Sequence, residues 1–193
     1  MSSVLKADRK QSPFEARDHA LRLQARLRDL CYRKMGYKRP RINPYNAKLG
    51  RDKTTSELYD EEQQLIELEN YWLSIVDEEA DLVKKYMKEC IRHIVVANSI
   101  YAQYISECDD RRSHQNTAIG LLYAISIELQ STLESVPPID KNSYEQYFAD
   151  IEYEINLIKG WRKSDNKTRT IVTKGNNKSK KNKKKQESEE LNK

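Results

Sequence analysis

The sequence has little of what turn-rich β folds, disulfide frameworks and membrane spans require. Its 193 residues include only five glycines and five prolines, which favours long helices. No apolar run approaches the roughly 20 residues of a membrane-spanning helix, and residues 1–10 lack the apolar core of a secretory signal. The three cysteines include no CxxC pair, so we expect reduced thiols in a cytoplasmic protein without a membrane partner.

Sequence patterns of catalysis and metal binding are also missing. A di-iron site in a helical bundle needs Glu-x-x-His pairs, but no glutamate lies three residues before His19, His93 or His114. Cys90 and His93 are one helical turn apart and could supply two zinc ligands, but no second pair follows them. The sequence has no glycine-rich phosphate loop and no GxSxG or HExxH motif. We therefore expect no enzyme, no cofactor and no bound metal.

The net charge of +5 conceals a division of the chain into three parts. Residues 1–53 hold 15 lysines and arginines against 5 acidic residues, and residues 162–193 hold 12 against 4. Between them, residues 54–161 hold 8 against 21. This pattern predicts a basic N-terminal helix and linker, an acidic helical domain and a basic tail, with boundaries at these positions.

A first helix is expected from about Pro13 to Met35. Proline suits the first turn of a helix, and Gly36 suits the position just after its end. Residues 37–53 then read as an extended basic linker. The sequence leaves open whether this first helix joins the domain that follows it or docks on a partner.

Four further helices are expected in residues 54–161, with approximate ranges 56–77, 78–108, 111–134 and 142–160. No glycine or proline separates the first two, so one long helix is an alternative. The first of them carries a nearly heptad apolar stripe formed by Leu58, Leu65, Leu68, Trp72 and Ile75. Amphipathic helices with short connections must bury their stripes against one another. The expected fold is therefore all-α, an antiparallel four-helix bundle with an extra N-terminal helix.

The basic tail is expected to be disordered. Gly160 should end the last helix of the bundle, and residues 162–193 have almost nothing apolar to bury. Between Arg162 and Lys185 there are 11 basic residues and one acidic residue. A tail of this composition either binds polyanions or serves only to keep the protein in solution.

Lysines and arginines in the two basic parts are the candidate nucleic-acid contacts, because they neutralise phosphates and release counterions without reading base sequence. In the N-terminal part these residues are Arg22, Arg26, Arg33, Lys38, Arg39 and Arg41. In the tail they are Lys180, Lys181, Lys183, Lys184 and Lys185. The acidic domain itself, or an acidic surface of another subunit, is an alternative partner for both parts.

Two helices carry a pattern typical of a known family. One opens with Arg111-Arg112-Ser-His-Gln115, and the other ends in Lys159-Gly160-Trp161-Arg162-Lys163-Ser164. Over about residues 57–164 the chain resembles a bacterial four-helix-bundle family. That family includes the accessory variability determinant of diversity-generating retroelements and the proteins encoded in intervening sequences of ribosomal RNA genes.

The resemblance implies a non-enzymatic protein that assembles as a homopentamer, partners a reverse transcriptase and contacts template RNA or cDNA. By position, it implies that the nucleic-acid or polymerase contacts are Arg111, Arg112, Lys159, Arg162 and Lys163, while Trp161 packs the end of the bundle. The retroelement members are basic throughout, whereas residues 54–161 here have an excess of acidic residues. We therefore expect the basic parts at the two ends to provide most of the affinity.

The alternative function is a helical, oligomeric interaction protein that binds no nucleic acid. Tyrosine is frequent, with 12 residues, and eight of them fall in predicted helices. Tyrosines at helical spacing can stack on bases, but they more often line a core edge or a subunit interface. A homo-oligomer is thus expected under both interpretations.

Overall fold

A computed structural model describes residues 14–38 and 55–190 of the chain, with side chains placed for residues 14–38 and 63–175. Within this part the protein is all-α, and its only β pairing is an isolated bridge between Tyr37 and Ile139. The elements, in order, are α1 (Glu15–Tyr32), η2 (Lys34–Gly36), α3 (Thr55–Ser99), α4 (Ile105–Ser135), η4 (Lys141–Tyr144) and α5 (Glu145–Glu190), where η denotes a 3-10 helix.

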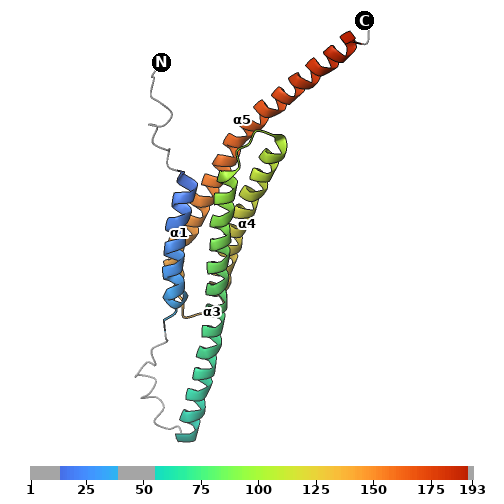
Figure 1. Ribbon diagram of the computed structural model, residues 1–193. Coiled ribbons are helices and arrows are strands. Elements are labelled where there is room, and N and C mark those ends of the chain that lie inside the picture. The colour runs from blue at the N-terminus through green and yellow to red at the C-terminus, as the bar shows by residue number, and fades with distance from the viewer. Residues whose placement is uncertain (1–13, 39–54, 191–193) are drawn as a thin grey trace, which may run out of the picture.

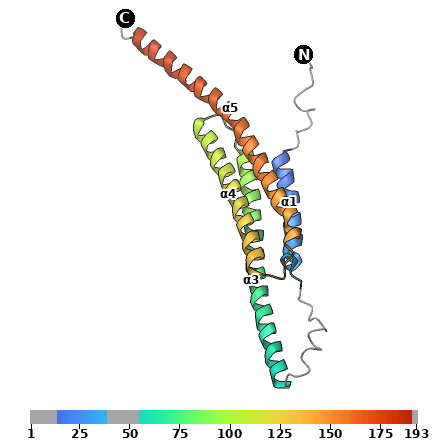
Figure 2. The same ribbon diagram turned by 180° about the vertical axis from the view of Figure 1, so that it is seen from behind.

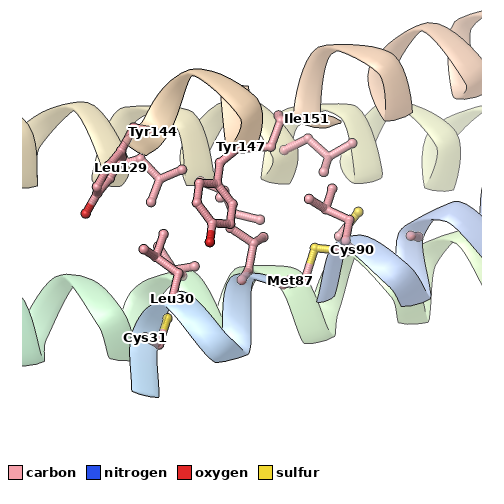
Figure 3. Packing of buried hydrophobic residues seen from close by; sticks show 14 of the residues in the cluster. Leu30, Cys31, Met87, Cys90, Leu129, Tyr144, Tyr147 and Ile151 are labelled. Carbon is pink, nitrogen blue, oxygen red and sulfur yellow. The ribbon is translucent and has the colours of Figure 1, made fainter. Parts of the chain in front are cut away.

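Figure 1 shows the arrangement of the four α-helices. Side chains from all four meet in one apolar core (Figure 3). They recur every three or four residues along each helix, which is the spacing of one helix face. Each leucine or isoleucine buried in this way contributes roughly 1.5–3 kcal/mol. The largest fully buried side chains include Leu23 and Leu27 of α1, Met87 and Ile94 of α3, Leu122, Ile125 and Leu129 of α4, and Ile151, Ile155 and Ile158 of α5.

The four helices that share this core are not the four expected from the sequence. The predicted break between residues 77 and 78 is absent, and one helix, α3, runs through it as the alternative allowed. It ends at Ser99 and not at residue 108, because residues 105–108 belong to α4. Because residues 55–99 then supply one helix instead of two, α1 provides the fourth, and its Ala20, Leu23 and Leu27 are buried. The first helix therefore joins the others.

The turn after α1 is held by a buried hydrogen bond. Lys34, Met35 and Gly36 adopt positive φ angles of 52°, 52° and 73°, so the helical path of α1 does not continue through them. The Tyr144 hydroxyl donates to the Met35 carbonyl oxygen at 2.7 Å, and both residues are buried. Glycine is suited to this conformation, whereas a residue with a Cβ is strained there.

Helix α5 does not stop at Gly160, so that prediction is wrong, and the helix continues to Glu190. Contacts on both sides of the glycine explain this. Ile158 is fully buried, and Trp161 packs against the core with its ring edge-on to Phe14 at 4.8 Å between centroids. These contacts offset the roughly 1 kcal/mol that glycine costs inside a helix. The expected disorder of residues 162–193 is accordingly not confirmed.

Two helices extend beyond the shared core, at opposite ends of the molecule. Both views show the first part of α3 projecting at one end and the last part of α5 projecting at the other (Figures 1 and 2). None of the helices within the described ranges combines the length and apolar character needed to cross a bilayer.

Replacing Gly160 by alanine should stabilise the protein. A Cβ at this position would meet no atom within 4 Å, and alanine is favoured over glycine inside a helix by about 1 kcal/mol. We expect Gly160→Ala to raise the free energy of unfolding measured by urea denaturation. Gly36→Ala is the matched control and should lower it, because residue 36 has a φ of +73°. A destabilised Gly160→Ala variant would show that α5 ends at this glycine.

Candidate nucleic-acid interface

Arg111, near the start of α4, joins three helices. Its guanidinium donates to the carbonyl oxygens of Ala97 at 3.1 Å and Ile100 at 2.6 Å, where α3 ends. It also forms an ion pair with Asp165 of α5 at 3.0 Å. Its side chain is only 18% exposed and lies 5.9 Å from the Trp161 ring centroid. Arg111 is thus a structural residue, with its charge neutralised by Asp165.

Arg112 and Arg162 are arranged differently, because their partners are uncharged. Arg112 donates to the side-chain oxygen of Asn166 at 3.2 Å, and Arg162 donates to that of Asn116 at 2.7 Å. An amide oxygen accepts a hydrogen bond but does not neutralise a guanidinium. These two contacts join α4 to α5 and leave two positive charges available to an external anion.

A small pocket lies between these helices. Arg111, Arg112, Arg162 and Arg169 are among its lining residues, together with Asp165. Its volume is about 10 Å³, which is room for no more than about one water molecule. The pocket is therefore too small to admit an organic molecule between the arginines.

Further lysines follow on α5. Lys159 donates to the Tyr123 hydroxyl at 3.1 Å and lies 5.6 Å from its ring centroid. Lys163, Lys167 and Lys174 are exposed, and no described carboxylate pairs with them. Arg169, by contrast, is paired with Asp109 at 2.8 Å. We call the surface formed by Arg112, Lys159, Arg162, Lys163, Lys167 and Lys174 the basic end.

The three predicted arginine contacts on or just after α1, Arg22, Arg26 and Arg33, lie outside the basic end, and two of them are neutralised. Arg26 forms an ion pair with Asp150 and lies over the Tyr147 ring. Arg33 pairs with Asp29 at 2.6 Å and also donates to the Tyr147 hydroxyl at 3.2 Å. Charges engaged in this way contribute little to phosphate binding.

The other predicted contacts divide into described and undescribed residues. Arg22 on α1 and Lys38 after η2 are exposed, with no carboxylate partner in the described ranges. Arg39 and Arg41 lie outside the described residues. The backbone of α5 includes Lys180, Lys181, Lys183, Lys184 and Lys185, whose side chains lie outside the described set.

A buried acid–histidine pair joins α1 to α5, and no sequence pattern pointed to it. The Glu154 side chain is fully buried, and its Oε2 lies 2.7 Å from His19 Nδ1. Burial raises the pKa of Glu154 to about 8, although Arg22 opposes the shift. Burial, with Arg22 and Arg26, lowers the pKa of His19. The pair therefore shares a single proton at neutral pH.

Two further pairs of titratable side chains join α3 to α4. The Nδ1 atoms of His93 and His114 lie 2.8 Å apart, so one ring must donate and the other accept. Burial, followed by the charge of His114, lowers the pKa of His93. The hydrogen bond that the protonated Glu128 carboxyl donates to Glu79 raises the pKa of Glu128 to about 7. Both helices thus carry polar contacts beside the apolar core.

No metal site is formed by the described residues: they include no group of three or more histidine, cysteine or acidic side chains placed to hold an ion. Cys90 and His93, the two possible zinc ligands predicted from the sequence, each have another partner. Cys90 is fully buried, its thiol donates to the Ala118 carbonyl oxygen at 3.6 Å, and burial raises its pKa. His93 faces His114.

No family model, no curated protein and no solved structure matches this chain.

The shared proton of Glu154 and His19 should produce a measurable pH dependence of stability. Above the ordinary histidine pKa of 6.5, the unfolded chain has released both protons, whereas the folded pair keeps one until the pH passes about 8. Stability should therefore fall between these two pH values, by up to about 1.4 kcal/mol per pH unit. Urea denaturation across this range measures it.

The Glu154→Gln variant should lose this fall in stability, since glutamine does not titrate. Glu152→Gln is the control, because Glu152 is exposed on the same helix. If Glu154→Gln keeps the wild-type pH profile between these values, the pair does not hold a proton in the folded state.

Proposed function

We propose that this chain is a non-enzymatic accessory protein that binds nucleic acid through its basic end. The observation that carries the proposal is the partnering of Arg112 and Arg162 with asparagine oxygens beside exposed lysines of the same helix. These cations are held in place by neighbouring side chains but are not neutralised. A phosphate can displace the neutral amide oxygens and gain a charge-assisted contact.

The length of α5 suits a nucleic-acid backbone. The basic residues from Lys159 to Lys185 lie on one helix, and 26 residues of helix span about 39 Å at 1.5 Å per residue. This is close to the roughly 34–36 Å of one turn of duplex DNA. A basic helix of this length can contact successive phosphates of one nucleic-acid strand. We therefore expect binding that depends on salt concentration and not on base sequence.

Two hollows lie on the described surface. The small pocket is lined by arginines that contact one another's helices. A wider, shallow groove is lined by Tyr123, Ser126, Ile127, Gln130 and Phe148, a set without histidine, cysteine or a carboxylate. Neither lining points to a particular reaction, so we propose none.

The narrower form of the proposal is a reverse-transcriptase accessory protein of a diversity-generating retroelement. It rests on the resemblance of the Arg111-Arg112 and Gly160-Trp161 segments, and it includes a four-helix bundle, a homo-oligomer and template RNA or cDNA as ligand. In this form, Arg111 positions α5 through Asp165, while Arg112, Lys159, Arg162 and Lys163 contact the nucleic acid or the polymerase.

Removing the two amide-partnered arginines should weaken nucleic-acid binding evenly across sequences. Each phosphate that a protein neutralises on a single strand contributes about 0.7 to the slope of log affinity against log salt. For the double variant Arg112→Gln/Arg162→Gln, this slope should therefore flatten by about 1.4. Fluorescence anisotropy with two unrelated single-stranded RNAs over a range of salt measures both effects.

Arg33→Gln is the matched control for this experiment, because Arg33 is exposed and already paired with Asp29. It should bind RNA as the wild type does. Equal affinities and slopes for all three proteins would assign the binding to another surface. A wild type without RNA affinity even at low salt would favour the interaction-protein alternative.

The narrower form is tested by gentle purification of the protein from its host. Co-purification of a reverse transcriptase together with one enriched RNA is the expected result. A homo-oligomer that carries neither polymerase nor RNA would contradict the accessory-protein assignment.

A further inference from the structure

The first part of α3 carries apolar side chains that the rest of the described chain does not cover. We call residues 55–71 the projecting segment, because Trp72 is the first α3 side chain that packs against the core and both views show the segment beyond the other helices (Figures 1 and 2). Leu65, Leu68 and Tyr71 are 56%, 41% and 60% exposed. An apolar row of this kind on a surface marks an interaction site.

The projecting segment is also acidic. Residues 55–71 contain six aspartates and glutamates and no lysine or arginine. Acidic residues lie on both sides of the row that contains Leu65 and Leu68. A helix with acidic flanks is suited to a basic partner, because like charges across a helix pair are destabilising.

The basic end has the complementary properties. From Lys159 to Lys174, α5 carries six lysines and arginines against the single acid Asp165. Exposed apolar side chains accompany these charges: Ile171 on α5 is 71% exposed, and Tyr101 and Tyr104 are exposed where α3 turns into α4. Lysine stems supply further apolar surface. Charge and apolar character therefore match those of the projecting segment.

One copy of the protein cannot bring these two surfaces together. They lie at opposite ends of the molecule, separated by the helices that form the core (Figures 1 and 2). We propose that the projecting segment of one copy docks on the basic end of a second copy, so that the chains associate head to tail.

A head-to-tail contact differs from a symmetric dimer in its consequence. After two copies associate, one still has a free projecting segment and the other a free basic end. Further copies can therefore add, and the assembly either closes into a ring or grows as an open filament. A symmetric pairing of two projecting segments would instead bring two acidic helices together. The head-to-tail contact does not depend on nucleic-acid binding, but both use the basic end, so RNA and a second copy should compete for it.

Complementation between two variants tests the proposal. Leu65→Ser/Leu68→Ser removes the apolar row of the projecting segment, and Lys167→Glu/Lys174→Glu reverses charge at the basic end. Wild type should self-associate at low salt in sedimentation velocity, and salt should weaken the association. Either variant alone should associate at least about tenfold more weakly.

An equimolar mixture of the two variants should form a one-to-one dimer, because each partner contributes one intact surface. Leu21→Ser is the control, since Leu21 is an exposed leucine of α1, and it should behave as wild type.

Several results would overturn this contact. Undiminished self-association of Lys167→Glu/Lys174→Glu, strengthened by salt, would show that projecting segments pair symmetrically. A wild type that stays monomeric at low salt would show that no second copy covers the segment. RNA affinity separates this proposal from the nucleic-acid one: Leu65→Ser/Leu68→Ser should bind RNA at least as tightly as wild type, whatever its oligomeric state.

Discussion

The contact of Arg111 with three helices is the interaction on which the basic end depends. The last carbonyl groups of a helix have no partners within it, and Arg111 donates to two carbonyl oxygens at the end of α3. The same guanidinium holds Asp165, five residues beyond Gly160. Asp165 in turn accepts from Gln115 of α4 at 2.7 Å. Together with the contacts of Arg112, Arg162 and Arg169, this network holds α5 beside α4 beyond the glycine, and it places Arg112 and Arg162 on one surface.

Much of the secondary structure could be predicted from the sequence, because apolar periodicity is a local property. The all-α class and the helical stripes of α1, α4 and α5 follow from it. The end of α5 could not be predicted, because the side chains that hold Gly160 within the helix come from α1 and α4. Similarly, the sequence permits a break in α3 near Asp77, but nothing in the structure interrupts the helix there.

The candidate site was predictable in composition but not in detail. Clusters of lysine and arginine are visible in any sequence, whereas their neutralisation depends on residues far away in the chain. Arg26 and its partner Asp150 are 124 positions apart. Glu154 shows the same limit, because one acidic residue between apolar positions does not reveal that His19 faces it. Counting charges therefore made α1 and α5 equally good candidates for nucleic-acid binding. Only the side-chain contacts in the structure show which of their charges are neutralised.

Helix α5 is continuous from the buried Glu154 to Glu190, with no loop between the core and the basic end. A continuous helix resists bending over such a length, and it transmits displacement as a rigid lever does. Its far end is therefore connected without a break to the segment around Trp161, whose ring contacts Phe14, just before α1, and Arg111 of α4. A ligand held at the far end of α5 would thus be joined to the core by one unbroken helix.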